Sequence, residues 1–160
     1  FIDADKKRHT GELDSNEEMT KNIIKTIVAM ANGKGGEIIL GAGDPQNQAY
    51  EVWTEVGLNE TDMSISGVNS SHDKYKLKIN NKIKGIANDE LFQRIKLNTF
   101  KSDGNTFCII EVKQIPKFKL ESDSFYNINN VVYYRKNGET SQLNENSRSA
   151  HKQDMITELY

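Results

Sequence analysis

Two carboxylates stand where the chain could hold a metal ion. Glu12 lies just before the first expected helix, and Asp44 lies just after the strand into which this helix leads. A helix and a strand joined by a short loop pack together, so both residues can reach one edge of the fold. Two carboxylates suit a hard divalent cation such as Mg²⁺ or Mn²⁺, which could polarise a phosphodiester and activate a water. The alternative is that both carboxylates have only structural roles: Glu12 interacts favourably with the helix dipole at the helix start, and Asp44 is a turn residue before Pro45.

Positive charge is concentrated in the middle of the chain, although the net charge is −2. Residues 1–73 carry 6 basic and 13 acidic side chains, residues 74–119 carry 11 and 4, and residues 120–160 carry 4 and 6. Clustered Lys and Arg hold phosphates, so this basic segment (residues 74–119) is a candidate nucleic-acid surface. The candidate phosphate-binding side chains are Lys74, Lys76, Lys78, Lys82, Lys84, Arg94, Lys96 and, from a later strand, Arg135. The alternative is the solvated face of one amphipathic element.

Other catalytic motifs do not fit the spacing. The glycine-rich stretch Asn32–Gly36 follows an expected helix and precedes a strand, the reverse of a phosphate-binding P-loop, so it predicts a helix end and a tight turn. His9, His72 and His151 are far apart in the sequence, which argues against a zinc site. Cys108 lies in an apolar strand, as a small core residue would. A hydrolase triad lacks its Gly-x-Ser-x-Gly elbow.

The elements that would position these residues begin with a helix over residues 15–32. Ser15 and Glu18 form a capping-box pattern, and apolar residues then recur at helical spacing as far as Ala31. The apolar run Glu37–Gly41 is bounded by glycines and predicts a buried strand. Gly43 with the next two residues predicts a turn.

Later segments predict a mixture of strands and helices. Strands are expected at residues 50–56, 91–101, 106–114 and 131–136, a loop at 57–73, and helices at 74–86 and 143–160. Residues 74–79 also alternate as a strand would, but the longer window favours the helix. Asp103-Gly104 is a hairpin signal between two of the strands, and Asn137-Gly138 ends the last one.

Composition sets the class of protein. The chain has 160 residues, of which 36% are hydrophobic and 28% charged, and no apolar window approaches the length of a membrane span. A single cysteine and the lack of a signal-like apolar start predict an intracellular protein. The order of elements predicts a single α/β (α+β) domain over residues 1–160, with a mixed, mostly antiparallel sheet and about three helices.

Four sequence blocks resemble the Schlafen-type AlbA_2 domain. They are Glu12–Asp14, Ile23–Asn32, Gly35–Asp44 and Tyr133–Thr140. In order, they are similar to the family's acidic strand, its helix ending in Ala-Asn, its glycine-glycine strand followed by an aspartate, and its late Tyr-Tyr-x-Arg-x-Gly strand. The resemblance implies a nucleic-acid-associated α/β fold, found in proteins labelled transcriptional regulators and in Schlafen proteins that cleave transfer and ribosomal RNA.

The resemblance also implies roles for particular residues. Schlafen nucleases use two glutamates five residues apart and an aspartate after the glycine strand. Glu12 matches the second glutamate and Asp44 the aspartate, whereas Lys7 stands at the place of the first glutamate. Asp14, which replaces the lysine of the family's acidic strand, or Asp5 would then supply the remaining ligand.

We therefore expect an intracellular, nucleic-acid-binding domain that acts as an Mg²⁺- or Mn²⁺-dependent endoribonuclease on structured RNA such as transfer RNA. The first alternative is a non-catalytic DNA- or RNA-binding or regulatory module of a larger transcriptional or antiviral-defence protein. A second is a dimerisation domain that only contacts protein. The expected partner is nucleic acid, with RNA favoured over DNA and no membrane. A homodimer would place two basic segments around one duplex.

Overall fold

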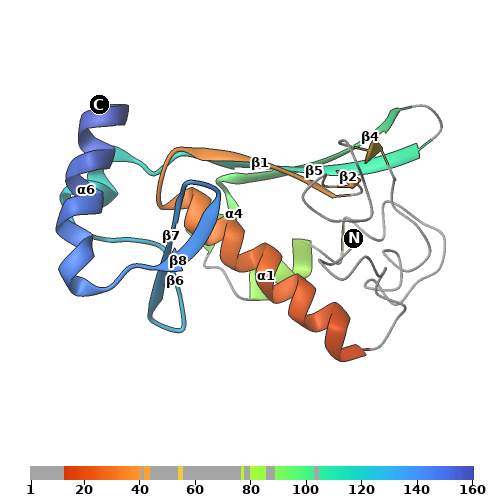
Figure 1. Cartoon of the computed structure of the whole chain (residues 1–160), viewed down its shortest axis with the longest axis horizontal. Helices are drawn as coiled ribbons and strands as arrows, with labels where there is room; N and C mark the ends of the chain where they lie inside the picture. The colour runs from red at the N-terminus through yellow and green to blue at the C-terminus, as the bar shows by residue number, and fades with distance from the viewer. Residues whose placement is uncertain are drawn as a thin grey trace. The chain divides into compact units, whose positions relative to one another are not determined.

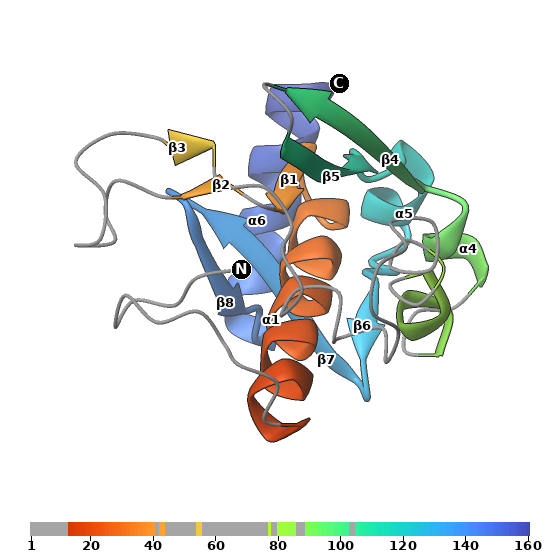
Figure 2. The same ribbon diagram turned by 90° about the vertical axis from the view of Figure 1, so that its right-hand side faces the viewer.

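The computed structural model describes most of the chain. The backbone is described for residues 13–40, 42–43, 54–55, 77, 80–85, 89–102 and 105–160, and the side chains for residues 21–40, 77, 80–85, 89–100 and 107–160. The elements in chain order are α1 (Leu13–Ala31), β1 (Gly35–Leu40), β2 (Ala42–Gly43), β3 (Thr54–Glu55), α4 (Asp89–Phe92), β4 (Ile95–Ser102), β5 (Asn105–Lys113), α5 (Lys117–Glu121), β6 (Asn127–Ile128), β7 (Val131–Lys136), β8 (Glu139–Gln142) and α6 (Glu145–Leu159) (Figures 1 and 2). Residues 77 and 80–85 are also helical, as the predicted helix over 74–86 requires.

Among the described residues, the strands form three sheets. One has the order β1-β5-β4, a second pairs β2 with β3, and the third has the order β6-β7-β8. The β2–β3, β6–β7 and β7–β8 pairs are antiparallel. Helices and antiparallel strands thus occur together, and the predicted α+β class is confirmed. Pro116 and α5 separate β5 from β6, because proline offers no N–H to continue a ladder, and the later strands form a sheet of their own.

The chain packs as two compact units. Unit 1 comprises Phe1–Thr20, Ile38–Lys82 and Lys96–Ile110, and unit 2 comprises Lys21–Glu37, Ile83–Ile95 and Glu111–Tyr160. Unit 2 contains a core cluster made by Ile115, Leu120, Phe125, Val132, Leu143 and Met155. In unit 1, Phe100 stacks on Phe107 with 5.0 Å between the ring centroids, and the expected core residue Cys108 is fully buried. The single domain over residues 1–160 stays a prediction.

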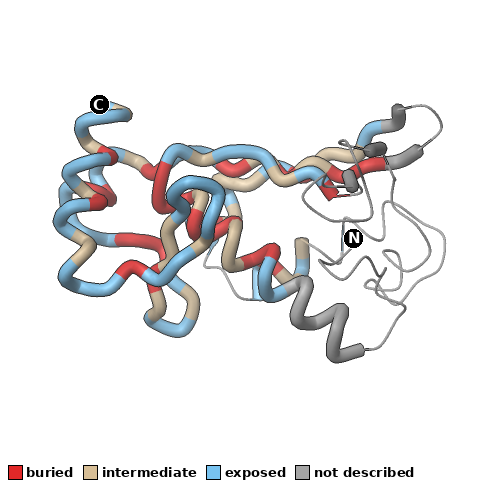
Figure 3. The backbone as a smooth tube through the Cα atoms, viewed as in Figure 1, coloured by how far each residue is buried: buried red, intermediate tan, exposed pale blue. Residues whose placement is uncertain are grey.

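Helix α1 confirms the helix expected from sequence. Buried and exposed stretches alternate along the helix (Figure 3). Among its described side chains, the buried ones are Ile23, Ile24, Ile27, Val28, Ala29 and Ala31, and all of these but Ala29 recur at spacings of three and four. Such spacing places them on one face, and burying that face is what stabilises the helix. The helix begins at Leu13, so Ser15 lies in its first turn and not at its cap.

The α1–β1 connection is a helix end followed by a tight turn, as predicted in place of a P-loop. The Asn32 amide donates to the Val28 carbonyl at 3.0 Å, and the Gly33 amide donates to that of Met30 at 3.0 Å. Gly35 has a φ of 72°, and a Cβ there would lie 2.7 Å from the Gln114 nitrogen. Only glycine fits this position, because both the backbone conformation and the approach of β5 exclude a side chain.

β7 and β8 form a hairpin of which sequence analysis predicts only the first strand. Their register pairs Lys136 with Glu139 and Arg135 with Thr140, which leaves two residues in the turn. Asn137 and Gly138 have φ values of 52° and 80°, as a type I′ turn requires at both positions. The Asn-Gly signal was therefore a hairpin signal.

Other boundaries differ from the predicted ones. The strand expected from Leu91 begins only at Ile95, because residues 89–92 form the short helix α4. Asp89 and Glu90 occupy the first turn of α4, where the helix dipole favours acidic side chains. α5 and β6 were not predicted, whereas α6 confirms the expected C-terminal helix. The expected strand at 50–56 is described only at β3, and the expected loop at 57–73 lies outside the described residues. In the part of the chain that is described, no helix has the length and apolar character to cross a membrane.

Candidate functional site

The predicted catalytic carboxylates flank described elements. Glu12 and Asp44 lie outside the described residues, as does the side chain of Asp14 in the first turn of α1. α1 begins at Leu13, directly after Glu12, and β2 ends at Gly43, directly before Asp44. Both carboxylates therefore adjoin described elements in the sequence, and their roles remain predictions.

The predicted phosphate-binding cations have different environments. Lys74, Lys76 and Lys78 lie outside the described residues, Lys82 is half-buried, and Lys84, Lys96 and Arg135 are exposed. The ammonium of Lys84 lies 4.7 Å from the centre of the Phe92 ring. Arg94 is half-buried, and its guanidinium donates to the Gln114 carbonyl. Arg94 thus already has a partner within the fold.

An open pocket of about 510 Å³ lies within unit 2 and was not predicted. Three segments line it: the end of α1 with the following turn, the β7–β8 hairpin, and one face of α6. The polar and charged lining residues are Lys34, Arg135–Asn137, His151, Asp154, Thr157 and Glu158. His151, Asp154 and Glu158 share a helix face because they are three or four residues apart.

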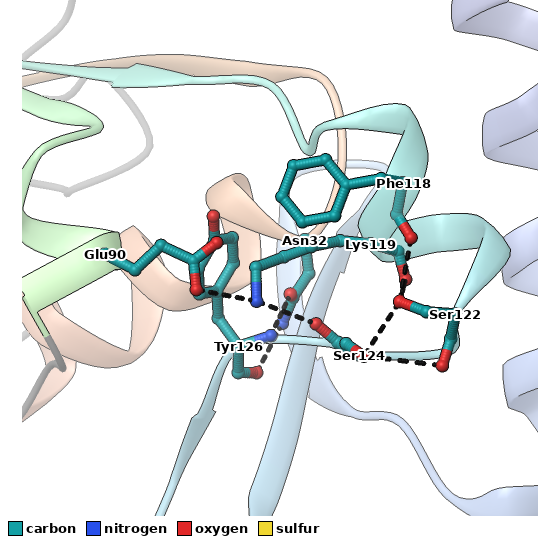
Figure 4. A network of polar contacts seen from close by, with 7 residues as sticks. All are labelled: Asn32, Glu90, Phe118, Lys119, Ser122, Ser124 and Tyr126. Atoms are coloured by element: carbon teal, nitrogen blue, oxygen red, sulfur yellow. Dashed lines mark hydrogen bonds and ion pairs between the residues drawn. The ribbon is translucent and has the colours of Figure 1, made fainter.

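Asn32 fastens these segments together. It is fully buried, and its side-chain nitrogen donates to the carbonyls of Tyr126 and Tyr133, each at 2.8 Å. Its side-chain oxygen accepts from the Tyr126 amide at 2.8 Å (Figure 4). All three bonds reach backbone groups about a hundred residues away, so Asn32 fixes the end of α1 against the β6–β7 region.

His151 connects α6 to Asn32 at the end of α1. Its Nε2 lies 2.8 Å from the Asn32 carbonyl oxygen. Because a carbonyl only accepts, Nε2 carries the proton, and in the neutral ring Nδ1 is the acceptor. The ring packs edge-on to Tyr134 with 5.2 Å between centroids and is tilted against Phe125 at 5.8 Å. These contacts hold the imidazole at the pocket wall.

Charge is unevenly distributed around the pocket. Lys34 and Glu158 form an ion pair at 3.1 Å with side chains 62% and 46% exposed, so solvent screens the pair. The Arg135 guanidinium donates to the Thr140 hydroxyl at 2.9 Å. Within the described residues, neither Arg135 nor Lys136 is paired with a carboxylate, and Asp154 has no cation partner. The hairpin side is therefore cationic and the α6 side carries carboxylates.

A second polar cluster engages part of the basic segment. Lys119 is buried, and its ammonium lies 3.0 Å from the Glu90 carboxylate, 3.4 Å from the Ser124 carbonyl and 4.6 Å from the centre of the Tyr126 ring (Figure 4). Burial, and second the Glu90 charge, raise the pKa of Tyr126 to about 12, although Arg94 acts in the opposite direction. Lys119 is thus satisfied inside unit 2 and is not placed to hold a phosphate.

Fold and site together define an α+β domain with a mixed-charge pocket beside a cationic hairpin. The family described as Schlafen, AlbA_2 matches residues 3–144, and the chain belongs to this family. The solution NMR structure of the N-terminal domain of a Nitrosomonas europaea protein, described as related to the ATP-dependent DNA helicase RecG, is similar in fold. The TM-score is 0.50 at 20% identity, over 79% of this chain and 77% of that one. No curated protein matches the chain.

Sequence reasoning missed Asn32 and His151 as organising residues. Asn32 was interpreted only as part of a helix end, although a polar residue next to a fully apolar helix face was a signal of a buried partner. His151 lies four residues before Met155 on the same helix face, which indicates a position at the core boundary. Neither signal identifies the distant partner.

Proposed function

We propose that this chain is a nucleic-acid-binding domain. The observation that carries the proposal is the β7–β8 hairpin, on which Arg135 and Lys136 are exposed and, within the described residues, form no ion pair with a carboxylate. A type I′ turn presents these two cations on a rigid support, and contacts from Arg and Lys to phosphate supply most nucleic-acid affinity. Membership of the Schlafen AlbA_2 family and the fold shared with a helicase-related domain support the same conclusion.

The finer proposal is a divalent-metal-dependent endoribonuclease that acts on structured RNA such as transfer RNA. Glu12 and Asp44 are its catalytic carboxylates, and Asp14 is the third candidate ligand. Their neighbours Leu13 and Gly43 both belong to unit 1. The carboxylate donor set suits Mg²⁺ or Mn²⁺, which when bound would supply charge neutralisation at the phosphodiester and a more acidic water.

Binding and cleavage are tested separately. Anisotropy of labelled transfer RNA and duplex DNA should show affinity that falls steeply with salt, because phosphate contacts release counterions. Changing Lys82, Lys84 and Arg135 together to Glu should abolish binding. Matched changes at Lys21, Lys25 and Lys152, which lie outside the basic segment, alter the net charge equally and should weaken binding far less. Equal losses in both triple variants would contradict a specific cationic surface.

Cleavage is measured with the same transfer RNA in Mn²⁺. Glu12→Gln and Asp44→Asn should each keep binding and remove cleavage, whereas the control Asp123→Asn should keep both. A wild-type chain that binds RNA without cleaving it would favour the second candidate function, a non-catalytic binding or regulatory module. Lys7, at the place of the family's first glutamate, is the observation that favours this candidate.

A further inference from the structure

The pocket of unit 2 has walls of opposite charge. Arg135 and Lys136 line it from the hairpin, and Asp154 lines it from α6 with no cation partner among the described residues. An anion alone would be repelled by the carboxylate, and a cation alone by the hairpin. The walls therefore suit a ligand that has an anionic group at one end and N–H donors at the other.

Part of the remaining lining is apolar. Ala29, Met30 and Met155 contribute to it, together with the backbone of the α1–β1 turn, and the imidazole of His151 lies at its side. Methionine side chains adapt to flat rings and make favourable contacts with aromatic groups. The volume of about 510 Å³ lies in the range of small-ligand sites, which is about 300–1,000 Å³. A flat heterocycle joined to a phosphate matches this combination of surfaces.

We infer that the pocket receives one unstacked nucleotide of a bound single strand or loop, with its phosphate at Arg135 and Lys136 and its base edge at Asp154. The inference rests on the proposed nucleic-acid binding and gives that function a base-reading site. Proteins read single-stranded RNA by splaying out a base and bonding to its edge. A carboxylate accepts two parallel N–H bonds best, and among the common bases guanine offers two adjacent donors on its pairing edge. Guanine is therefore the preferred base.

Methionine methyl groups provide a direct probe of the pocket. The chain has four methionines, of which Met30 and Met155 line the pocket. In the full chain labelled with ¹³C at the methionine methyl groups, a short single-stranded oligouridine RNA with one central guanosine should shift both resonances. An all-uridine strand should shift them less. Met30→Leu and Met155→Leu assign the two signals.

A variant pair isolates the base contact. Asp154→Asn should weaken binding of the guanosine strand about tenfold and remove its advantage over the uridine strand. Glu145→Gln, an exposed change on the same helix but outside the pocket lining, should leave both affinities unchanged. Asp154 is exposed, so circular dichroism should show an unaltered fold.

The alternatives give different results. Strand binding measured by anisotropy, with Met30 and Met155 resonances unmoved, would overturn the pocket inference and leave nucleic-acid binding intact. No strand binding at all would overturn both. Guanosine monophosphate that shifts the two methyl groups when the strand does not would overturn the strand assignment and identify a free-nucleotide site.

Discussion

Two polar clusters are buried in unit 2, and they are built differently. Around Asn32, a neutral amide makes three bonds of 2.8 Å to backbone groups. Around Lys119, a charged ammonium is balanced by Glu90, whose side chain is 46% exposed. Removing Asn32 leaves the buried carbonyl and N–H of Tyr126 without this partner, whereas removing Lys119 leaves a carboxylate that solvent can reach. The neutral cluster should therefore contribute more to stability than the charged one.

The two clusters also differ in their relation to the pocket of unit 2. Through its carbonyl, Asn32 holds His151, and through its amide it holds the β6–β7 region, so it connects all three segments that line the pocket. Lys119 connects α5 to α4 and contributes nothing to the pocket lining. We therefore expect the neutral cluster to control ligand binding as well as stability.

The largest expected effect is that of Asn32→Ala. Loss of the amide leaves the buried carbonyl and N–H of Tyr126 and the part-buried carbonyl of Tyr133 without this partner, which should lower the free energy of unfolding by about 3–5 kcal/mol. Urea denaturation measures this loss. Asn144→Ala is a matched control, because Asn144 caps α6 at an exposed position, and it should cost about 1 kcal/mol. Equal costs at both asparagines would remove the proposed role of Asn32 in holding unit 2 together.

A smaller effect is expected at the charged cluster. Lys119→Met keeps the apolar stem and removes the ion pair and the contact with the Tyr126 ring, so it should cost about 1 kcal/mol. A double-mutant cycle with Glu90→Gln should give a coupling energy below about 1 kcal/mol, because Glu90 is partly solvated. A loss as large as that for Asn32→Ala would contradict the expected difference between the two clusters.

The helices and strands that could be predicted from the sequence are those whose predictive residues lie within or next to the element. The apolar spacing of α1 and the glycines around β1 are such local signals, and both elements form where they are predicted. The prediction that the β1 strand is buried was wrong, because within β1 only Leu40 is buried and Ile39 is 48% exposed. The hairpin had a local signal too, at Asn137-Gly138, but the polar strand β8 after it lacks the apolar alternation of a half-buried strand. α5 has only five residues, too few for helical periodicity to be recognised.

Less of the candidate functional site than of the fold could be predicted from the sequence. Spacing and family resemblance pick out Glu12 and Asp44 because both stand beside recognisable elements, and their roles stay predictions. The pocket is assembled from residues near 30, 136 and 155, and no local pattern joins segments so far apart. Lys119 belongs to the basic segment that was expected to hold phosphates, yet it forms an ion pair with Glu90. A count of basic residues does not distinguish such a buried lysine from one on a phosphate-binding surface.

The smallest effect expected is a titration within the charged cluster. Burial and then Glu90 raise the pKa of Tyr126 to about 12, which means that the fold favours the neutral phenol. This contribution to stability is fully present below the unfolded-state pKa of about 10 and is lost as the pH rises from there through about 12. Tyrosinate absorbance, as the difference between the chain and its Tyr126→Phe variant, isolates the group among six tyrosines. Glu90→Gln should lower the pKa only part of the way towards 10, because burial, the larger cause, remains. A return to 10 would make the Glu90 charge the main cause and show that the charged cluster is more strongly coupled than its solvent exposure implies.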